Sequence, residues 1–174
     1  MIQGDSTEYE ILKEACKTLD TDDLFTAEIG VRQGQGSKII LDELIFKKHW
    51  HIGIDPYANL EYQHYDDTSA YTCDYTDQMR DTMLNDFKPY RNQGKFTLYN
   101  DTDIKFMKDR AHQDSRFAFV HFDGPHMTRD VITEVVWFAN RAAPKTRYVF
   151  DDFPKYNMQL IRDILKYYDF DILD

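Results

Sequence analysis

The sequence has 174 residues, of which 42% are hydrophobic and 15% aromatic, so it carries enough apolar material for one folded domain with a buried core. Its 21 Lys and Arg residues stand against 31 Asp and Glu residues, which gives a formal net charge of −10. Such a surface repels phosphate backbones and anionic membranes, so nucleic acids and membranes are excluded as partners and a small molecule is favoured. A net negative charge also keeps a protein soluble, and this simpler explanation accounts for part of the excess of acidic residues.

Cysteine usage and the lack of long apolar runs indicate the expected compartment. Cys16 and Cys73 form neither a CxxC pair nor a Cys/His zinc spacing, which favours a reducing environment. The segment Met1–Glu10 is polar and lacks the apolar stretch of a signal peptide. No run approaches the ~18 apolar residues of a membrane-spanning helix. We therefore expect a cytoplasmic protein.

Apolar residues alternate along the chain between the spacings of strands and of helices. In chain order, the pattern predicts a strand over Leu24–Val31, a helix over Gly34–Lys48, a strand over Trp50–Asp55, a helix over Asp77–Tyr90, a strand over Lys95–Tyr99, a helix over Ile104–His112, a strand over Phe117–Asp123, a helix over Thr128–Arg141, a strand over Arg147–Asp151, a helix over Asn157–Tyr168 and the start of a strand over Phe170–Leu173. This alternation indicates a mostly parallel sheet with right-handed crossovers. The expected fold is a single Rossmann-like, doubly wound α/β domain that spans residues 1–174.

One segment, Pro56–Thr76, interrupts the alternation. It is polar, and it carries several tyrosines: Tyr57, Tyr62, Tyr65, Tyr71 and Tyr75. A long irregular segment inside a compact domain is often a lid or a binding loop. A surface insertion without a role is the alternative.

A glycine-rich turn follows the first expected strand. In the stretch EIGVRQGQGS, the glycines Gly30, Gly34 and Gly36 permit a tight turn and a close approach of a ligand to the backbone. Ser37 is placed to cap the helix that follows. An ordinary strand-to-helix turn would show the same residues, so the turn alone does not decide the function.

A carboxylate at the end of the second strand adds to this turn. Asp55 stands where open α/β sheets place an acid that accepts hydrogen bonds from both ribose hydroxyls, although Asp-Pro is also a plain turn former. The glycine spacing matches neither the dinucleotide fingerprint nor a P-loop. Glu28, just before the turn, would repel a pyrophosphate and suits a cationic ligand. The combination favours a cationic nucleoside over NAD.

These residues resemble motif I of class I S-adenosylmethionine-dependent methyltransferases, and the stretch HIGID resembles their motif II. The resemblance implies that Gly30, Gly34 and Gly36 line the cofactor. It also implies that Glu28 lies close to the methionine end and that Asp55 holds the ribose. The family often contacts adenine after the third strand, which here corresponds to Asn100, Asp101 and Thr102.

Acidic residues end the fourth and fifth expected strands. Asp123 begins the stretch DGPH, which His126 closes, and the fifth strand ends in Asp151 and Asp152. Both ends meet at the carboxyl edge of a parallel sheet, so we expect these carboxylates to converge. An oxygen-only cluster suits Mg²⁺, Ca²⁺ or Mn²⁺ rather than zinc. A turn at Asp123 and a helix cap at Asp151 and Asp152 are the alternatives, and a lone His126 is more often structural.

The stretch from His121 to Phe153 resembles the metal-dependent small-molecule O-methyltransferases, among them the macrocin and mycinamicin type and the cephalosporin-hydroxylase-like group. More distantly, it resembles catechol O-methyltransferase. The resemblance implies that Asp123, Asp151 and Asp152 ligate Mg²⁺, that Asp123 also touches the cofactor and that His126 is a general base.

Two positions depart from the family pattern. The usual Gly-Gly turn before the fifth strand is Pro144-Lys145-Thr146, and the sequence ends in its sixth expected strand, whereas the family normally adds an antiparallel seventh. The seventh strand is lost, or the chain is incomplete, or another subunit covers the edge. Because exposed edge strands are usually covered, we expect a homodimer or an unusual edge.

The function expected from these observations is an S-adenosylmethionine-dependent methyltransferase that methylates a hydroxyl of a small acceptor, a sugar or a phenol, at a divalent-metal site. The alternative is a domain of the same fold that binds S-adenosylmethionine without catalysis. A sugar-nucleotide or NAD enzyme is disfavoured by the glycine spacing and by Glu28.

Overall fold

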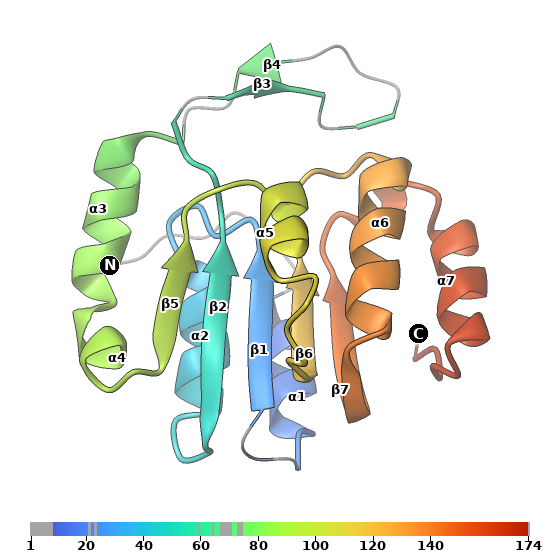
Figure 1. Ribbon diagram of the computed structural model, residues 1–174, viewed down its shortest axis with the longest axis horizontal. Coiled ribbons are helices and arrows are strands. Elements are labelled where there is room, and N and C mark those ends of the chain that lie inside the picture. Colours follow the sequence, from blue (N-terminus) through green and yellow to red (C-terminus); the bar gives the residue numbers. More distant parts are fainter. Residues whose placement is uncertain are drawn as a thin grey trace.

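A five-stranded parallel sheet forms the centre of the computed structural model, which describes residues 9–20, 22, 24–58, 60–63, 65–66, 71–72 and 75–173 (Figure 1). The strand order is β5-β2-β1-β6-β7, and every neighbouring pair is parallel. The strands are β1 (Leu24–Ile29), β2 (His49–Ile54), β5 (Phe96–Tyr99), β6 (Phe117–Phe122) and β7 (Ala142–Phe150). This order confirms the expected Rossmann-like α/β fold, and it places the carboxyl ends of β1, β2 and β6 side by side.

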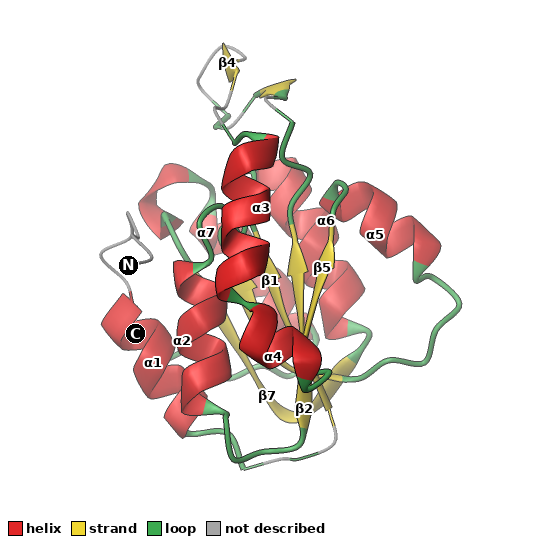
Figure 2. Cartoon of the chain, turned by 90° about the vertical axis from the view of Figure 1, so that its left-hand side faces the viewer, coloured by secondary structure: helices red, strands yellow, loops and turns green. Residues whose placement is uncertain are grey.

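Helices cover both faces of the sheet (Figures 1 and 2). One face packs against α5 (Asp103–Asp109), α6 (Thr128–Ala139) and α7 (Met158–Tyr167) through the largest apolar cluster, which includes Phe106, Phe138 and Ile161. The other face packs against α1 (Tyr9–Lys17) and α2 (Gln35–Glu43). The helices α3 (Asp77–Asp86) and α4 (Lys88–Asn92) lie beside β5, where Phe87 and Phe96 are in ring contact.

The composition of the central strands explains this layering. All six residues of β6 are buried, as a strand covered on both faces requires. Residues of β1 alternate between the two layers: Ala27 and Ile29 enter the cluster below α6, whereas Thr26 and Glu28 face α2. The polar residues of β1 are therefore buried inside the sheet-to-helix layer.

Several expected elements differ from the structure in their bounds. The helix expected over Asp77–Tyr90 is two helices that break at Phe87, because the backbone before Pro89 disfavours a continuous helix. β7 begins at Ala142 and includes Pro144, which an edge strand tolerates, and its register with β6 breaks between Phe117 and Phe119. The segment expected to be irregular contains a short antiparallel pair, β3 (Glu61–Tyr62) and β4 (Tyr71–Thr72).

Two expectations about the ends of the chain are wrong or incomplete. Phe170–Leu173 is not a strand: Asp169 has a left-handed φ of 60°, Phe170 donates its N–H to the carbonyl of Leu165 (3.0 Å), and its ring packs on Tyr148. The chain thus folds back on α7. The sequence reading also missed α1, whose Leu12 and Cys16 are buried one turn apart. No helix among the described residues is long and apolar enough to cross a membrane.

Candidate active site

The turn after β1 requires glycine at its first position. Gly30 has a φ of +82°, and a Cβ there would lie 1.9 Å from the carbonyl oxygen of Asp123. Two backbone hydrogen bonds hold this approach: Gly30 donates to Ile54 (2.9 Å), and Asp123 donates to Ile29 (2.9 Å). The ends of β1, β2 and β6 therefore meet at one point.

Asp55 ties the glycine turn to the end of β2. Its Oδ2 accepts the backbone N–H groups of Val31 (2.9 Å) and Arg32 (2.8 Å), and its Oδ1 accepts that of Tyr57 (2.8 Å). Burial raises the pKa of this carboxyl, and the three N–H donors oppose that rise. Asp55 thus positions the turn, and its contact with a ribose remains a prediction.

A chain of buried hydrogen bonds lies beneath the turn. Ser37 donates to Oε2 of Glu28, so its oxygen must accept the Nε2–H of His51 (2.8 Å). Nδ1 of His51 then accepts the hydroxyl of Thr26 (2.9 Å). Burial keeps the pKa of His51 well below its usual range, which agrees with a neutral ring in this chain.

Both carboxylate oxygens of Glu28 take part in hydrogen bonds. Its Oε1 pairs with Nδ1 of His121 (2.8 Å), while Ser37 holds the other oxygen. A Cβ at Gly36 would lie 1.8 Å from Oε1, so this glycine makes room for the carboxylate. Ser37 was expected to cap α2, and this is wrong: the cap is Gly34, in the left-handed region, and Ser37 faces the sheet from inside the helix.

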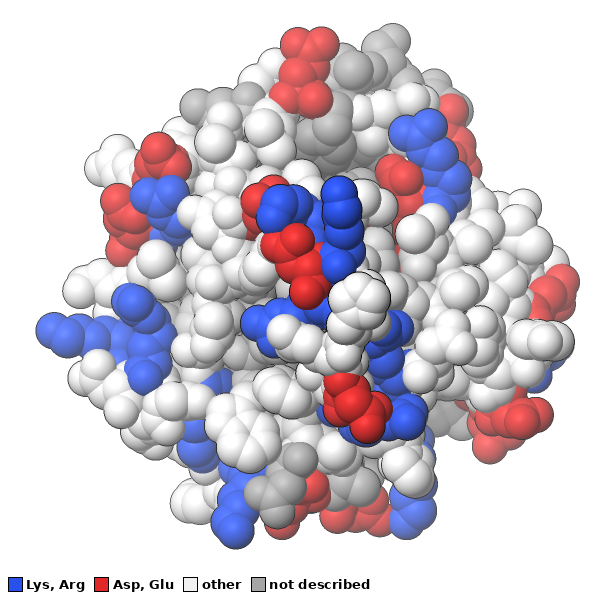
Figure 3. Space-filling model, in the orientation of Figure 1, with Lys and Arg blue, Asp and Glu red and all other residues white. Residues whose placement is uncertain are grey.

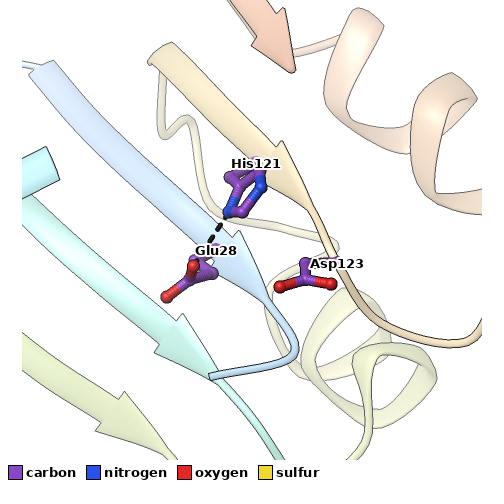
Figure 4. A group of neighbouring side chains, drawn as sticks. All are labelled: Glu28, His121 and Asp123. Atoms are coloured by element: carbon purple, nitrogen blue, oxygen red, sulfur yellow. Dashed lines mark hydrogen bonds and ion pairs between the residues drawn. The ribbon is translucent and has the colours of Figure 1, made fainter. Parts of the chain in front are cut away.

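Glu28, His121 and Asp123 form a compact group (Figure 4), with one potential ligand atom from each residue within 4.8 Å of the others. Asp123 stands at the end of β6, beside the Glu28–His121 pair. Because both oxygens of Glu28 already accept hydrogen bonds, a metal there would have to displace them. We interpret the group as the charged floor of the ligand site.

Above this floor lies a pocket of about 350 Å³, in the size range of small-molecule sites. Among the residues that the structure describes, its wall combines apolar residues, such as Ile29, Ile54 and Tyr75, with a single cation, Arg129. Five described acids line the same space: Asp55, Glu61, Asp103, Asp123 and Asp130. A pocket with this charge favours a cationic ligand with an apolar part and disfavours a pyrophosphate.

The predicted cofactor residues divide into two groups. Gly30, Asp55, Thr102 and Asp123 line the pocket. Glu28, Gly34, Gly36, Ser37 and Asp101 are absent from its lining. Gly34 packs instead on Met83 and Phe87, to which a Cβ would come within 2.9 Å. Thr102 caps α5 by accepting the N–H of Lys105 (3.2 Å), and Asp101 accepts the N–H of Thr102 (2.8 Å).

The ring of His126, the predicted general base, stacks nearly parallel to two tyrosine rings. Its centroid lies 5.8 Å from that of Tyr65 and 5.6 Å from that of Tyr156. Its Nδ1 is 3.9 Å from Oδ2 of Asp152, and only 3% of the residue is exposed.

Asp151 and Asp152, predicted metal ligands, have other partners. Oδ1 of Asp151 accepts the N–H of Asp152 (3.0 Å), and Oδ2 of Asp152 accepts the Tyr65 hydroxyl (2.8 Å). Among the described residues, these two carboxylates and Asp123 do not form a convergent ligand group. As arranged, their oxygens do not converge, so they could hold Mg²⁺ only after Asp152 leaves the Tyr65 hydroxyl.

Sequence reasoning missed one residue of the pocket wall and several buried groups behind it. Asp103, Glu134 and the buried His51–His121 chain were not predicted. One signal was present: Glu134 falls on the buried stripe of α6 beside Val131, Val135 and Phe138, where a carboxyl needs a special partner.

A second, more open groove of about 720 Å³ runs between α3, α4 and β5. Its lining is basic, with Arg80, Lys88 and Arg91 against Asp81, and it shares no residue with the acidic pocket. Figure 3 shows charges of both signs over this face of the molecule, and the glycine turn does not border the groove. The candidate site is therefore the acidic pocket.

Comparison with solved structures identifies the fold. The chain is similar to a SAM-dependent methyltransferase from Agrobacterium tumefaciens, with a TM-score of 0.55 and 12% identity over 82% of this chain and 42% of that one. It is similar to an rRNA methylase from Streptococcus thermophilus, with a TM-score of 0.55 and 8% identity over 96% and 80% of the two chains. It is also similar to CalS11, a TDP-rhamnose 3'-O-methyltransferase, with a TM-score of 0.56 and 12% identity over 85% and 62%.

The chain shares a Rossmann-like fold with these methyltransferases. It spans 42% of the Agrobacterium protein and 62% of CalS11, so these likenesses concern the fold and not the whole proteins. No protein-family model and no curated protein matches the sequence.

Proposed function

We propose that this chain binds S-adenosylmethionine in the acidic pocket and transfers its methyl group to a hydroxyl of a small acceptor. The observation that carries the proposal is the position of that pocket. It lies over the Gly30 turn, at the carboxyl ends of β1, β2 and β6, and five carboxylates of the described residues stand on its wall. Parallel α/β sheets bind ligands at this edge, and the acids suit a ligand with a sulfonium and an ammonium group.

The cofactor would lie with its nucleoside against Ile54, Pro56 and the start of α5, and with its cationic end toward Asp123. The apolar lining at Ile54 and Tyr75 supports a planar base, and Asp123 with Glu28 beneath it supports the positive end. Glu28 is buried under the turn and does not touch the ligand, so it would act on the cationic end of the cofactor through the electric field of its carboxylate.

In the transfer step, a lone pair of the acceptor oxygen forms a bond to the methyl carbon while the carbon–sulfur bond breaks and its electron pair returns to sulfur. The acceptor proton passes to a base, and His126 is our candidate for it. The chain's contribution is to align the oxygen with the methyl group and to exclude water, and Leu60, Glu61 and Gln63 form part of the pocket wall that would do so.

The acceptor is proposed to be a small hydroxylated molecule such as a sugar or a phenol. The net charge of −10 supports a small acceptor over a nucleic acid. Magnesium dependence and a homodimer remain part of the proposal. A Mg²⁺ site at Asp123, Asp151 and Asp152 would require Asp152 to leave Tyr65.

A binding domain without catalysis is the second candidate. The observation that favours it is the burial of His126 against the rings of Tyr65 and Tyr156, outside the pocket lining. Release of S-adenosylhomocysteine during incubation with a panel of sugars and phenols distinguishes the two. Turnover that needs both the acceptor and His126 supports the enzyme, whereas cofactor binding without turnover for any acceptor supports the binding domain.

A further inference from the structure

Two buried carboxyl groups meet at the wall of the acidic pocket. Asp103 opens α5 and Glu134 lies on α6, which packs on α5, and the two carboxyl groups lie within hydrogen-bonding reach of each other. Glu134 is 1% exposed and Asp103 is 8% exposed. Only Asp103 lines the pocket, so Glu134 contacts the site through it. The pair joins the two helices that form this wall.

This contact requires a proton. Ionised carboxylates only accept hydrogen bonds, and neither Oδ2 of Asp103 nor Oε1 of Glu134 has a donor among the described residues. A proton on one of the two groups supplies it. Burial raises the pKa of Glu134 well above its usual range, and the negative charge of Asp103 raises it further, so Glu134 is the group that carries the proton.

The surroundings of Glu134 favour its neutral form. Asp103 faces it from α5, Asp130 lies one turn earlier on α6, and the phenol of Tyr156 approaches from the segment before α7. The nearest cation on α6, Arg129, pairs with Asp130 instead (3.2 Å). No ion pair among the described residues neutralises Glu134.

We propose that Glu134, as a neutral acid, is a positioning residue that donates to Asp103 and holds the first turn of α5 in the pocket wall, so that ligand affinity depends on this proton. The identity of the ligand rests on the proposed function. When the proton is lost, two adjacent buried carboxylates repel each other. The turn that carries Thr102 and Ile104, both of which line the pocket, then leaves its place.

Glu134→Gln tests the proposal, because an amide N–H still donates to Asp103 but cannot ionise. Binding of S-adenosylmethionine is measured by calorimetry at about pH 6 and about pH 9. Between about pH 6 and about pH 9, we expect the affinity of the unchanged protein to fall at least about tenfold more than that of the variant. A tenfold difference corresponds to a change of about one unit in the pKa of Glu134 on ligand binding. Titration of the ligand itself is common to both proteins. Asp163→Asn, which removes an exposed charge from α7 outside the pocket lining, is the control and should keep the pH dependence.

Hydrogen exchange of the backbone amides in Thr102–Lys105 gives a reading without ligand. After correction for intrinsic rates, exchange should accelerate at high pH in the unchanged protein and stay level in Glu134→Gln. Identical profiles would overturn the shared proton. A difference in exchange with equal pH dependence of binding would overturn the positioning role. If exchange differs as expected but S-adenosylmethionine binds neither protein, the proposed function fails while the proton-held turn is supported.

Discussion

Replacing Gly30 by alanine tests the geometry at the centre of the site. The new Cβ would lie 1.9 Å from the carbonyl oxygen of Asp123 and 2.5 Å from its carbonyl carbon, and both are backbone atoms that cannot rotate away. The residue would also keep a φ of +82°, which L-residues with a side chain rarely adopt. The end of β1 must therefore separate from the end of β6.

Two contributions give the size of the effect. A left-handed conformation at a non-glycine residue costs roughly 1–2 kcal/mol, and overpacking against a rigid neighbour typically costs about 1–3 kcal/mol. Together, Gly30→Ala should lower the free energy of unfolding by about 2–5 kcal/mol. For a protein of this size, each kcal/mol shifts Tm by about 2–4 °C. Urea and thermal unfolding measure this loss.

Gly94→Ala is the matched control. Gly94 also has a positive φ, of +68°, but a Cβ there meets nothing within 4 Å. Its replacement should carry only the conformational contribution, about 1–2 kcal/mol. S-adenosylmethionine binding should weaken in Gly30→Ala and stay unchanged in Gly94→Ala. Equal losses of stability in the two variants would refute the close approach of Gly30 to Asp123.

Further predictions concern the groups around the turn. Asp55→Asn leaves one of three backbone N–H donors facing an amide, so stability should fall by about 1–3 kcal/mol in urea unfolding; an unchanged midpoint would contradict its role in the turn. Because burial lowers the pKa of His51, its contribution to stability is present above the ordinary pKa of about 6.5 and is lost as pH falls through the lower folded value. Tm of the unchanged protein should thus decrease on acidification more than that of His51→Gln, and parallel curves would speak against a neutral His51. His126→Gln should reduce turnover on the order of 10²–10⁴-fold with cofactor affinity unchanged, and equal turnover would remove it from the mechanism. Asp151→Asn should abolish any heat of Mg²⁺ binding, and heat that persists would place the metal elsewhere.

The meeting of Gly30, Asp55 and Asp123 could be predicted from the sequence. Apolar runs mark the strands, and parallel strands bring their carboxyl ends to one edge, so residues that follow those runs converge. What the sequence did not reveal is the direction of each side chain. Asp55 turns inward to backbone N–H groups, and Glu28 lies under the turn rather than in the pocket.

Asp151 and Asp152 illustrate why proximity alone was insufficient. Their position after β7 is as expected, but Asp152 adopts a left-handed φ of 49°. Tyr65, which is remote in sequence, donates its hydroxyl to Asp152 and stacks on His126. Such contacts depend on tertiary packing that periodicity does not contain. Helix α1 was missed for a simpler reason: its apolar face is narrow, with Leu12 and Cys16 among charged residues.

Calorimetric binding of S-adenosylmethionine to the purified protein tests the central claim most directly, with NAD⁺ as the anionic comparison. The acidic pocket above Gly30 predicts micromolar binding of S-adenosylmethionine, weaker binding in Gly30→Ala and none of NAD⁺. Binding of NAD⁺ in preference to S-adenosylmethionine, or of neither, would contradict it.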